Sequence, residues 1–77
     1  MVNYTDYIEV NKEIMLGKPV IKGSRLTVEM ILEELAAGTS VSDLVEAHPH
    51  LTLEAVYAAL SFAADALKVN RTYPLAV

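Results

Sequence analysis

The clearest pattern in the chain is a helical spacing of apolar residues that starts after Thr27. The i, i+3, i+4, i+7 spacing of a buried helical stripe is met by Val28, Ile31, Leu32 and Leu35. Thr27 is a suitable N-cap for this helix, and Gly38 supplies the left-handed residue that ends it. We therefore expect a first helix between these two residues.

Two further helices follow at short intervals. Ser40 stands three residues before Asp43, as in a short capping box, and Pro49 ends the second helix near residues 47–48. Thr52 caps the third helix, which we expect to end near residue 68. Its predicted buried stripe consists of Leu53, Val56, Tyr57, Leu60, Ala64 and Leu67.

The residues before the first helix have the properties of short strands. Residues 7–10 and 19–21 are β-prone, Asn11 and Lys12 offer a turn between them, and Pro19 limits the second strand to an edge or to its first residue. We expect one domain of the mainly α class, a three-helix, helix-turn-helix-like domain with a short N-terminal β arm or hairpin. Its parts would be the arm (1–26), the helical core (27–68) and a C-terminal tail (69–77).

The third helix also has a second apolar face, which is rich in alanine. Small side chains let another helix or strand approach closely, and an isolated two-stranded arm is marginal in water. We therefore expect a homo-oligomer, a dimer or larger, although an alanine preference for helix stability also accounts for this face. The predicted partner or oligomer interface consists of Tyr7, Val20, Ile21, Ala55, Ala59, Phe62 and Ala63.

Charge is distributed unevenly along the chain, whose net charge is −4. Lys18, Lys22 and Arg25 lie close together in the arm, whereas residues 26–67 contain seven acids and no Lys or Arg. If DNA is bound, we expect these three arm residues, together with Thr52 at the start of the third helix, to make the contacts. The alternative is that the arm cations neutralise acids of a neighbouring subunit.

Candidate chemistry is sparse. The chain has no cysteine, and its serines stand where capping or packing explains them, so we expect no catalytic residues and no enzymatic activity. His48 and His50 lack the further ligands of a zinc site, and Gly23 has no phosphate-binding fingerprint around it, so we expect no metal and no cofactor. The absence of cysteine and of an apolar run of about 20 residues indicates a cytoplasmic protein with no membrane partner.

The run from residue 17 to residue 67 resembles a bacterial family catalogued as domain of unknown function 433 (DUF433). The most specific part is Gly-Lys-Pro-Val-Ile-Lys-Gly-Ser-Arg at 17–25. The positions that follow at the spacing of the family are Gly38, Asp43, Pro49, Leu51 and Thr52.

This resemblance implies a helix-turn-helix-like fold grouped with the DNA-binding parts of VapB-type antitoxins. It also implies an antitoxin-like regulatory role, in which the protein binds a cognate PIN-like nuclease toxin and, as a dimer, its own operator DNA. The acidic, alanine-rich third helix is a departure that argues against base readout by that helix. The alternative function is a homo-oligomeric protein-interaction module that binds no nucleic acid.

Overall fold

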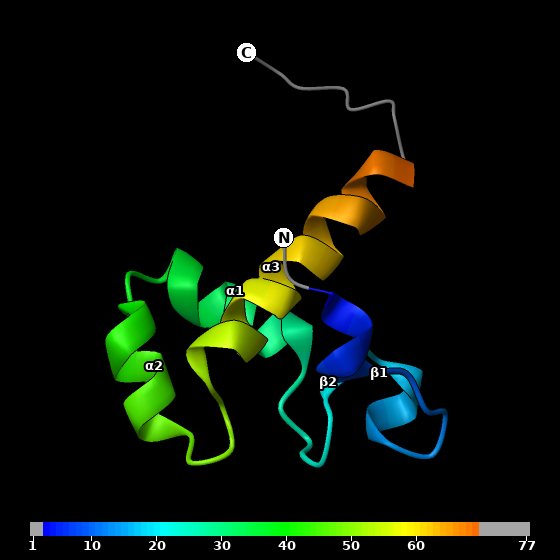
Figure 1. Cartoon of the computed structure of the whole chain (residues 1–77), viewed down its shortest axis with the longest axis horizontal. Helices are drawn as coiled ribbons and strands as arrows, with labels where there is room; N and C mark the ends of the chain where they lie inside the picture. The colour runs from blue at the N-terminus through cyan, green and yellow to red at the C-terminus, as the bar shows by residue number, and fades with distance from the viewer. Residues whose placement is uncertain (1–2, 70–77) are drawn as a thin grey trace.

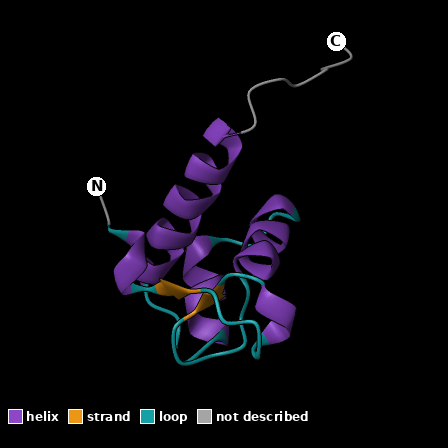
Figure 2. Ribbon diagram, turned by 90° about the vertical axis from the view of Figure 1, so that its right-hand side faces the viewer, coloured by secondary structure: helices purple, strands orange, loops and turns teal. Residues whose placement is uncertain are grey.

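The computed structural model describes residues 3–69 and has three helices beside a two-stranded hairpin (Figures 1 and 2). The expected mainly α fold with an N-terminal hairpin is confirmed. The elements in chain order are η1 (Tyr4–Asp6), β1 (Ile8–Glu9), η2 (Met15–Gly17), β2 (Val20–Ile21), α1 (Val28–Ala36), α2 (Val41–Ala47) and α3 (Leu53–Val69). Most of the predicted tail lies outside the described residues.

The hairpin is joined to the start of α1 by backbone hydrogen bonds. β1 and β2 are antiparallel, with Ile8 opposite Ile21. The backbone N–H of Ile21 donates to the carbonyl of Leu26 (2.9 Å), and that of Val28 donates to the carbonyl of Pro19 (2.9 Å). The arm is therefore part of the same folded unit as the helices.

The predicted helix ends are confirmed, because each depends on a cap only a few residues away. The hydroxyl oxygen of Thr27 accepts from the backbone N–H of Met30 (3.0 Å), and that of Ser40 accepts from Asp43 (3.0 Å). Thr52 caps α3 in the same way by accepting from Ala55 (3.1 Å). Gly38 follows α1 with a φ of 99°, a conformation that favours glycine.

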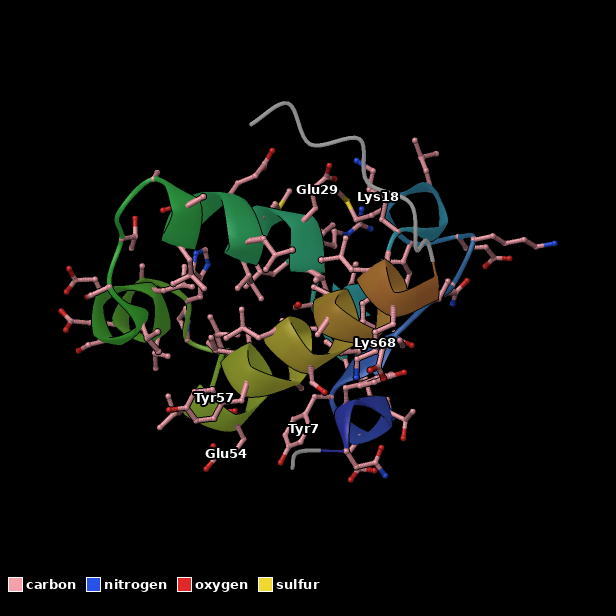
Figure 3. The ribbon with its side chains drawn as sticks, turned by 90° about the horizontal axis from the view of Figure 1, so that it is seen from above. Tyr7, Lys18, Glu29, Glu54, Tyr57 and Lys68 are labelled. Carbon is pink, nitrogen blue, oxygen red and sulfur yellow. The ribbon has the colours of Figure 1, made fainter. Side chains whose placement is uncertain are left out.

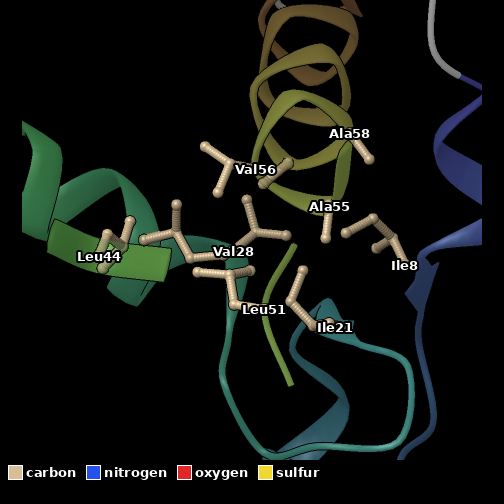
Figure 4. Packing of buried hydrophobic residues seen from close by; sticks show 10 residues of the cluster. Ile8, Ile21, Val28, Leu44, Leu51, Ala55, Val56 and Ala58 are labelled. Atoms are coloured by element: carbon tan, nitrogen blue, oxygen red, sulfur yellow. The ribbon is translucent and has the colours of Figure 1, made fainter. Parts of the chain in front are cut away.

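The core lies where α3 crosses α1 and the hairpin, and the alanine face of α3 is part of it (Figure 4). Ala55, Ala58 and Ala59 are buried, and Val56 lies beside them. Small side chains allow the helix axes to approach closely, and this close approach occurs inside the domain. The rest of the buried cluster consists of Ile8, Ile21, Val28, Ile31, Leu44 and Leu51.

The predicted buried stripe of α3 is wrong at most positions. Leu53, Tyr57 and Leu60 are 44%, 48% and 39% exposed, and Leu67 is 60% exposed. Ala64 is also exposed, so Val56 is the member of the predicted stripe that lies in the core. A domain of this size has a thin core, and α1 and the hairpin cover the small residues of α3 rather than the large ones.

Candidate functional site

Lys18 is held at the surface by an acid of the first helix. Its Nζ lies 2.8 Å from Oε1 of Glu29, and the two side chains are both about half exposed (Figure 3). The hydrogen bond to Glu29 and the negative charge of that carboxylate raise the pKa of Lys18. This pairing within the chain competes with any contact between Lys18 and a phosphate. The acid belongs to the same subunit, whereas the alternative stated above concerns acids of a neighbouring one.

Lys22 and Arg25 are placed differently from Lys18. Both side chains are exposed, and neither makes a hydrogen bond or an ion pair within residues 3–69. The backbone of Lys22 is fixed, because its N–H donates to the carbonyl of Tyr7 (2.8 Å). Arg25 lies beside a shallow depression that Glu9, Ile14, Gly23 and Ser24 also line. Two cations of the arm are thus presented to solvent from a hydrogen-bonded segment.

An apolar groove with charged edges lies between the arm, α1 and α3. Its volume is about 450 Å³, and its lining includes Val28 and Leu32 of α1, Phe62 of α3 and Pro19 of the arm. Glu29 and Glu33 also line it, with Lys18 paired to the first of them. Apolar walls with a few charged groups are typical of a binding site, and this volume is within the usual range of about 300–1,000 Å³.

The acidic side chains of the three helices are all at the surface. Glu29, Glu33 and Glu34 belong to α1, and Asp43 and Glu46 belong to α2. α3 adds Glu54 near its first turn (Figure 3). Of these acids only Glu29 and Glu33 line the groove, where Lys18 also lies.

The predicted interface residues are divided between the core and the surface. Val20, Ile21, Ala55 and Ala59 are buried within the chain, so their side chains are already covered without a partner. The packing of α3 on α1 and the hairpin accounts for this burial, and contact of the seven residues with a partner stays a prediction. Tyr7, Phe62 and Ala63 are half-buried, and Phe62 also lines the groove.

The predicted DNA-contacting set also separates into groups with different roles. Thr52 is exposed, but its hydroxyl oxygen already accepts the capping hydrogen bond of α3. Lys18 is paired with Glu29, while Lys22 and Arg25 remain available. Of the four predicted DNA-contacting residues, Lys22 and Arg25 are therefore the two whose side chains make no polar contact in the described part of the chain.

The tight turn at Met15–Gly17 is a feature that sequence reasoning missed. Met15, Leu16 and Gly17 all have positive φ values (48°, 59° and 83°), and Leu16 is 94% exposed. Left-handed backbone is costly for a leucine, so the turn depends on the hydrogen bonds around it, such as Gly17 N–H to Ile14 O (3.0 Å). In the sequence Gly17 indicates a turn of this kind, but nothing there indicates that Met15 and Leu16 also adopt positive φ values.

The described residues show neither a metal cluster nor a membrane span. Within residues 3–69 no group of three His, Cys, Asp or Glu side chains is arranged to hold an ion, and no helix there has the length and apolar character to cross a bilayer. His48 and His50 line a small depression of about 90 Å³ together with Pro49 and Leu51.

Comparison with known proteins gives one match. A family described as "Protein of unknown function (DUF433)" matches residues 8–63, which include the hairpin, α1, α2 and the first two thirds of α3. No curated protein and no solved structure matches the chain.

Proposed function

The chain belongs to the DUF433 family, whose description names no function, and we propose that it is a regulatory protein of the antitoxin type that binds a basic partner protein. The partner proposed from the family resemblance is a PIN-like nuclease. The protein has no catalytic role in this proposal. Its serines support that view, because Ser40 caps α2 and Ser24 bonds to the backbone at Ile21 (2.9 Å) and Leu26 (3.1 Å).

The observation that carries this proposal is the apolar groove with Glu29 and Glu33 at its edge. A nuclease that holds RNA needs a cationic cleft, and complementary charge favours both encounter and orientation of an acidic partner. Apolar residues such as Leu32 and Phe62 offer contact area that charge alone does not provide. A segment of the partner protein with basic and apolar side chains would match both the acidic edge and the apolar walls of the groove.

The proposal is tested by titrating the protein into a PIN-like nuclease, chosen from the genes beside its own, and following RNA cleavage. We expect inhibition that is complete at equimolar protein. Glu33→Lys should weaken inhibition about tenfold, because it places a cation where the partner's cations would dock.

Glu46→Lys is the matched control, because it makes the same charge change on α2, away from the groove residues. We expect it to change inhibition less than about twofold, since Glu46 lies outside the groove lining and a charge outside the contact adds little to affinity. Equal effects of the two changes, or no inhibition by the unmodified protein, would refute the groove as the site.

Operator DNA is a second candidate ligand, favoured by the exposure of Lys22 and Arg25. In a dimer these residues would supply four cations, so the logarithm of the affinity should fall with the logarithm of salt concentration with a slope of about −4. The paired Lys18 should add little to this slope.

The DNA proposal is tested by fluorescence anisotropy with DNA from upstream of the gene. The double change Lys22→Glu with Arg25→Glu should abolish binding, whereas Lys12→Glu, also an exposed arm lysine, should reduce it only modestly. DNA affinity that survives the double change would exclude the arm as the contact surface.

A further inference from the structure

We propose that α3 forms an antiparallel homodimer with a second copy of this chain through its exposed apolar seam, defined as Leu53, Tyr57, Leu60 and Ala64. These residues repeat at intervals of four, three and four, which is the heptad spacing of a helix-pairing surface. All four are exposed, and Leu67 continues the spacing by another three residues. This self-association surface is separate from the groove and the arm cations that carry the proposed function.

The position of the seam makes it accessible to another molecule. Figures 1 and 2 both show the C-terminal half of α3 extending beyond α1 and α2. Residues 64 and 66–68 are exposed there, whereas residues 61–63 and 65 are half-buried, so one side of this half is open. Helices stay folded in water mainly by packing an apolar face, and a second copy of the same helix would supply that packing.

The charges beside the seam select an antiparallel arrangement. Glu54 and Lys68 each lie seven residues from Ser61, near opposite ends of α3 (Figure 3). A two-fold axis near Ser61 places Glu54 of one copy beside Lys68 of the other, twice in the dimer. A parallel pair would instead place Glu54 and Lys68 at opposite ends of the interface, where they cannot pair. Lys68 lies 3.5 Å from Asp65 in the same helix, a long and exposed contact that an intermolecular pair can replace.

Side-chain sizes along the seam fit the same arrangement. The axis near Leu60 and Ser61 brings the large Tyr57 of one copy toward the small Ala64 of the other. Leu60 then lies beside its own counterpart at the centre. Large residues opposite small ones allow two helices to interdigitate along the whole seam.

The exposed area predicts how strong this dimer is. About 40–50% of the surface of the large seam side chains is available, which with Ala64 is on the order of 300 Å² per copy, against about 800 Å² per partner in a standard interface. We therefore expect a reversible dimer with a dissociation constant in the micromolar range. Sedimentation equilibrium of the full chain from roughly 1 to 500 µM should resolve both species.

Substitutions in the seam test the contact itself. Leu60→Asp should leave the circular-dichroism spectrum unchanged, since Leu60 lies outside the core, and should weaken dimerisation at least about tenfold. Leu16→Asp is the matched control, because it makes the same change at an exposed leucine of the arm, and it should leave dimerisation unchanged. A chain that stays monomeric at all concentrations, or a dimer that Leu60→Asp leaves intact, would overturn the proposal.

Charge exchange tests the direction of pairing. Glu54→Lys and Lys68→Glu should each weaken the dimer, and the double exchange should restore it, because each change alone brings like charges together. A dimer that is insensitive to both single changes would overturn the antiparallel arrangement.

Cross-linking provides an independent test of direction, because the chain has no cysteine of its own. Ser61→Cys should form an intermolecular disulfide under oxidation, while Leu53→Cys should not, since its counterpart would lie at the far end of the pair. Equal cross-linking at both positions would indicate parallel helices and overturn the proposal.

Discussion

The two apolar faces of α3 differ in side-chain size, and the smaller residues are the buried ones. Ala58 and Ala59 are fully buried against the rest of the domain, whereas Tyr57 and Leu60 are 48% and 39% exposed. Hydrophobicity alone would assign the opposite arrangement, since leucine and tyrosine have more apolar surface to hide than alanine. The comparison shows that apolar content alone does not determine which face of α3 is internal.

The two faces also differ in what they are able to bind. The alanine face has already formed its contacts with α1 and the hairpin, so it has no surface left for another molecule. The seam of Leu53, Tyr57, Leu60 and Ala64 retains its apolar surface and therefore has the capacity for a contact between molecules. Each face can be changed by one substitution without altering the other, which makes the comparison testable.

The largest effect is expected from enlarging the buried face. Ala59→Leu adds three carbon atoms at a position with no free space, so we expect a loss of about 3 kcal/mol or more in the free energy of unfolding. Ala64→Leu makes the same change on the exposed seam and should alter stability by less than about 0.5 kcal/mol. Urea unfolding followed by circular dichroism at low micromolar protein measures both. Equal losses would show that the two faces are packed alike.

A smaller effect is expected from shortening one residue on each face. Val56→Ala leaves a cavity in the core and should cost about 2 kcal/mol at any protein concentration. Leu60→Ala should cost less than about 0.5 kcal/mol in dilute solution, where the chain is monomeric.

Repeating the unfolding experiment at high protein concentration sharpens this difference. The midpoint for the unmodified chain should rise as dimers form, because association stabilises the folded state by mass action. The Leu60→Ala variant should lose most of that rise, while Val56→Ala should keep it. A midpoint that does not depend on concentration in any of the three chains would contradict a contact through the seam.

The helix ends were predictable from the sequence, whereas the orientation of α3 was not. Thr27, Ser40 and Gly38 act within a few residues, and the local sequence contains all the information that their capping bonds require. The positions of α1 and the hairpin determine which face of α3 is covered. The spacing of residues within α3 does not predict those positions. Hydrophobic spacing therefore favoured the leucine stripe, whereas the structure buries the alanine stripe.

The candidate site was predictable in its residue types but not in its contacts. The cluster of Lys18, Lys22 and Arg25 was evident from charge spacing alone. The pairing of Lys18 with Glu29 joins residues eleven positions apart and exists because the arm folds back on the start of α1. The groove likewise arises from three separate segments, so its lining follows from tertiary packing rather than from any local motif.

The smallest expected effect concerns η1, which packs against α3 on the side of its buried alanines. The ring of Tyr4 meets that of Phe62 edge to face, with centroids 5.4 Å apart. A hydrogen bond to Asp65 and the negative charge of that carboxylate raise the pKa of Tyr4 above the ordinary value of 10.0. The folded chain thus holds the phenolic proton more tightly than the unfolded chain. The stabilisation is fully present below pH 10.0 and is lost as the pH rises through the higher pKa of the folded state.

Tyr4→Phe removes the hydroxyl that interacts with Asp65 and keeps the aromatic ring that contacts Phe62. The variant retains the edge-to-face packing on Phe62, so we expect a slight loss of stability at neutral pH and a smaller decline than the unmodified chain shows above pH 10.0. Ultraviolet titration of the phenols should also lose its most alkaline component. Asp65→Asn is the companion change, because it removes the charge and should return the pKa of Tyr4 toward its ordinary value. If the alkaline component persists in both variants, another tyrosine is responsible for it, and η1 is held against α3 by ring packing alone.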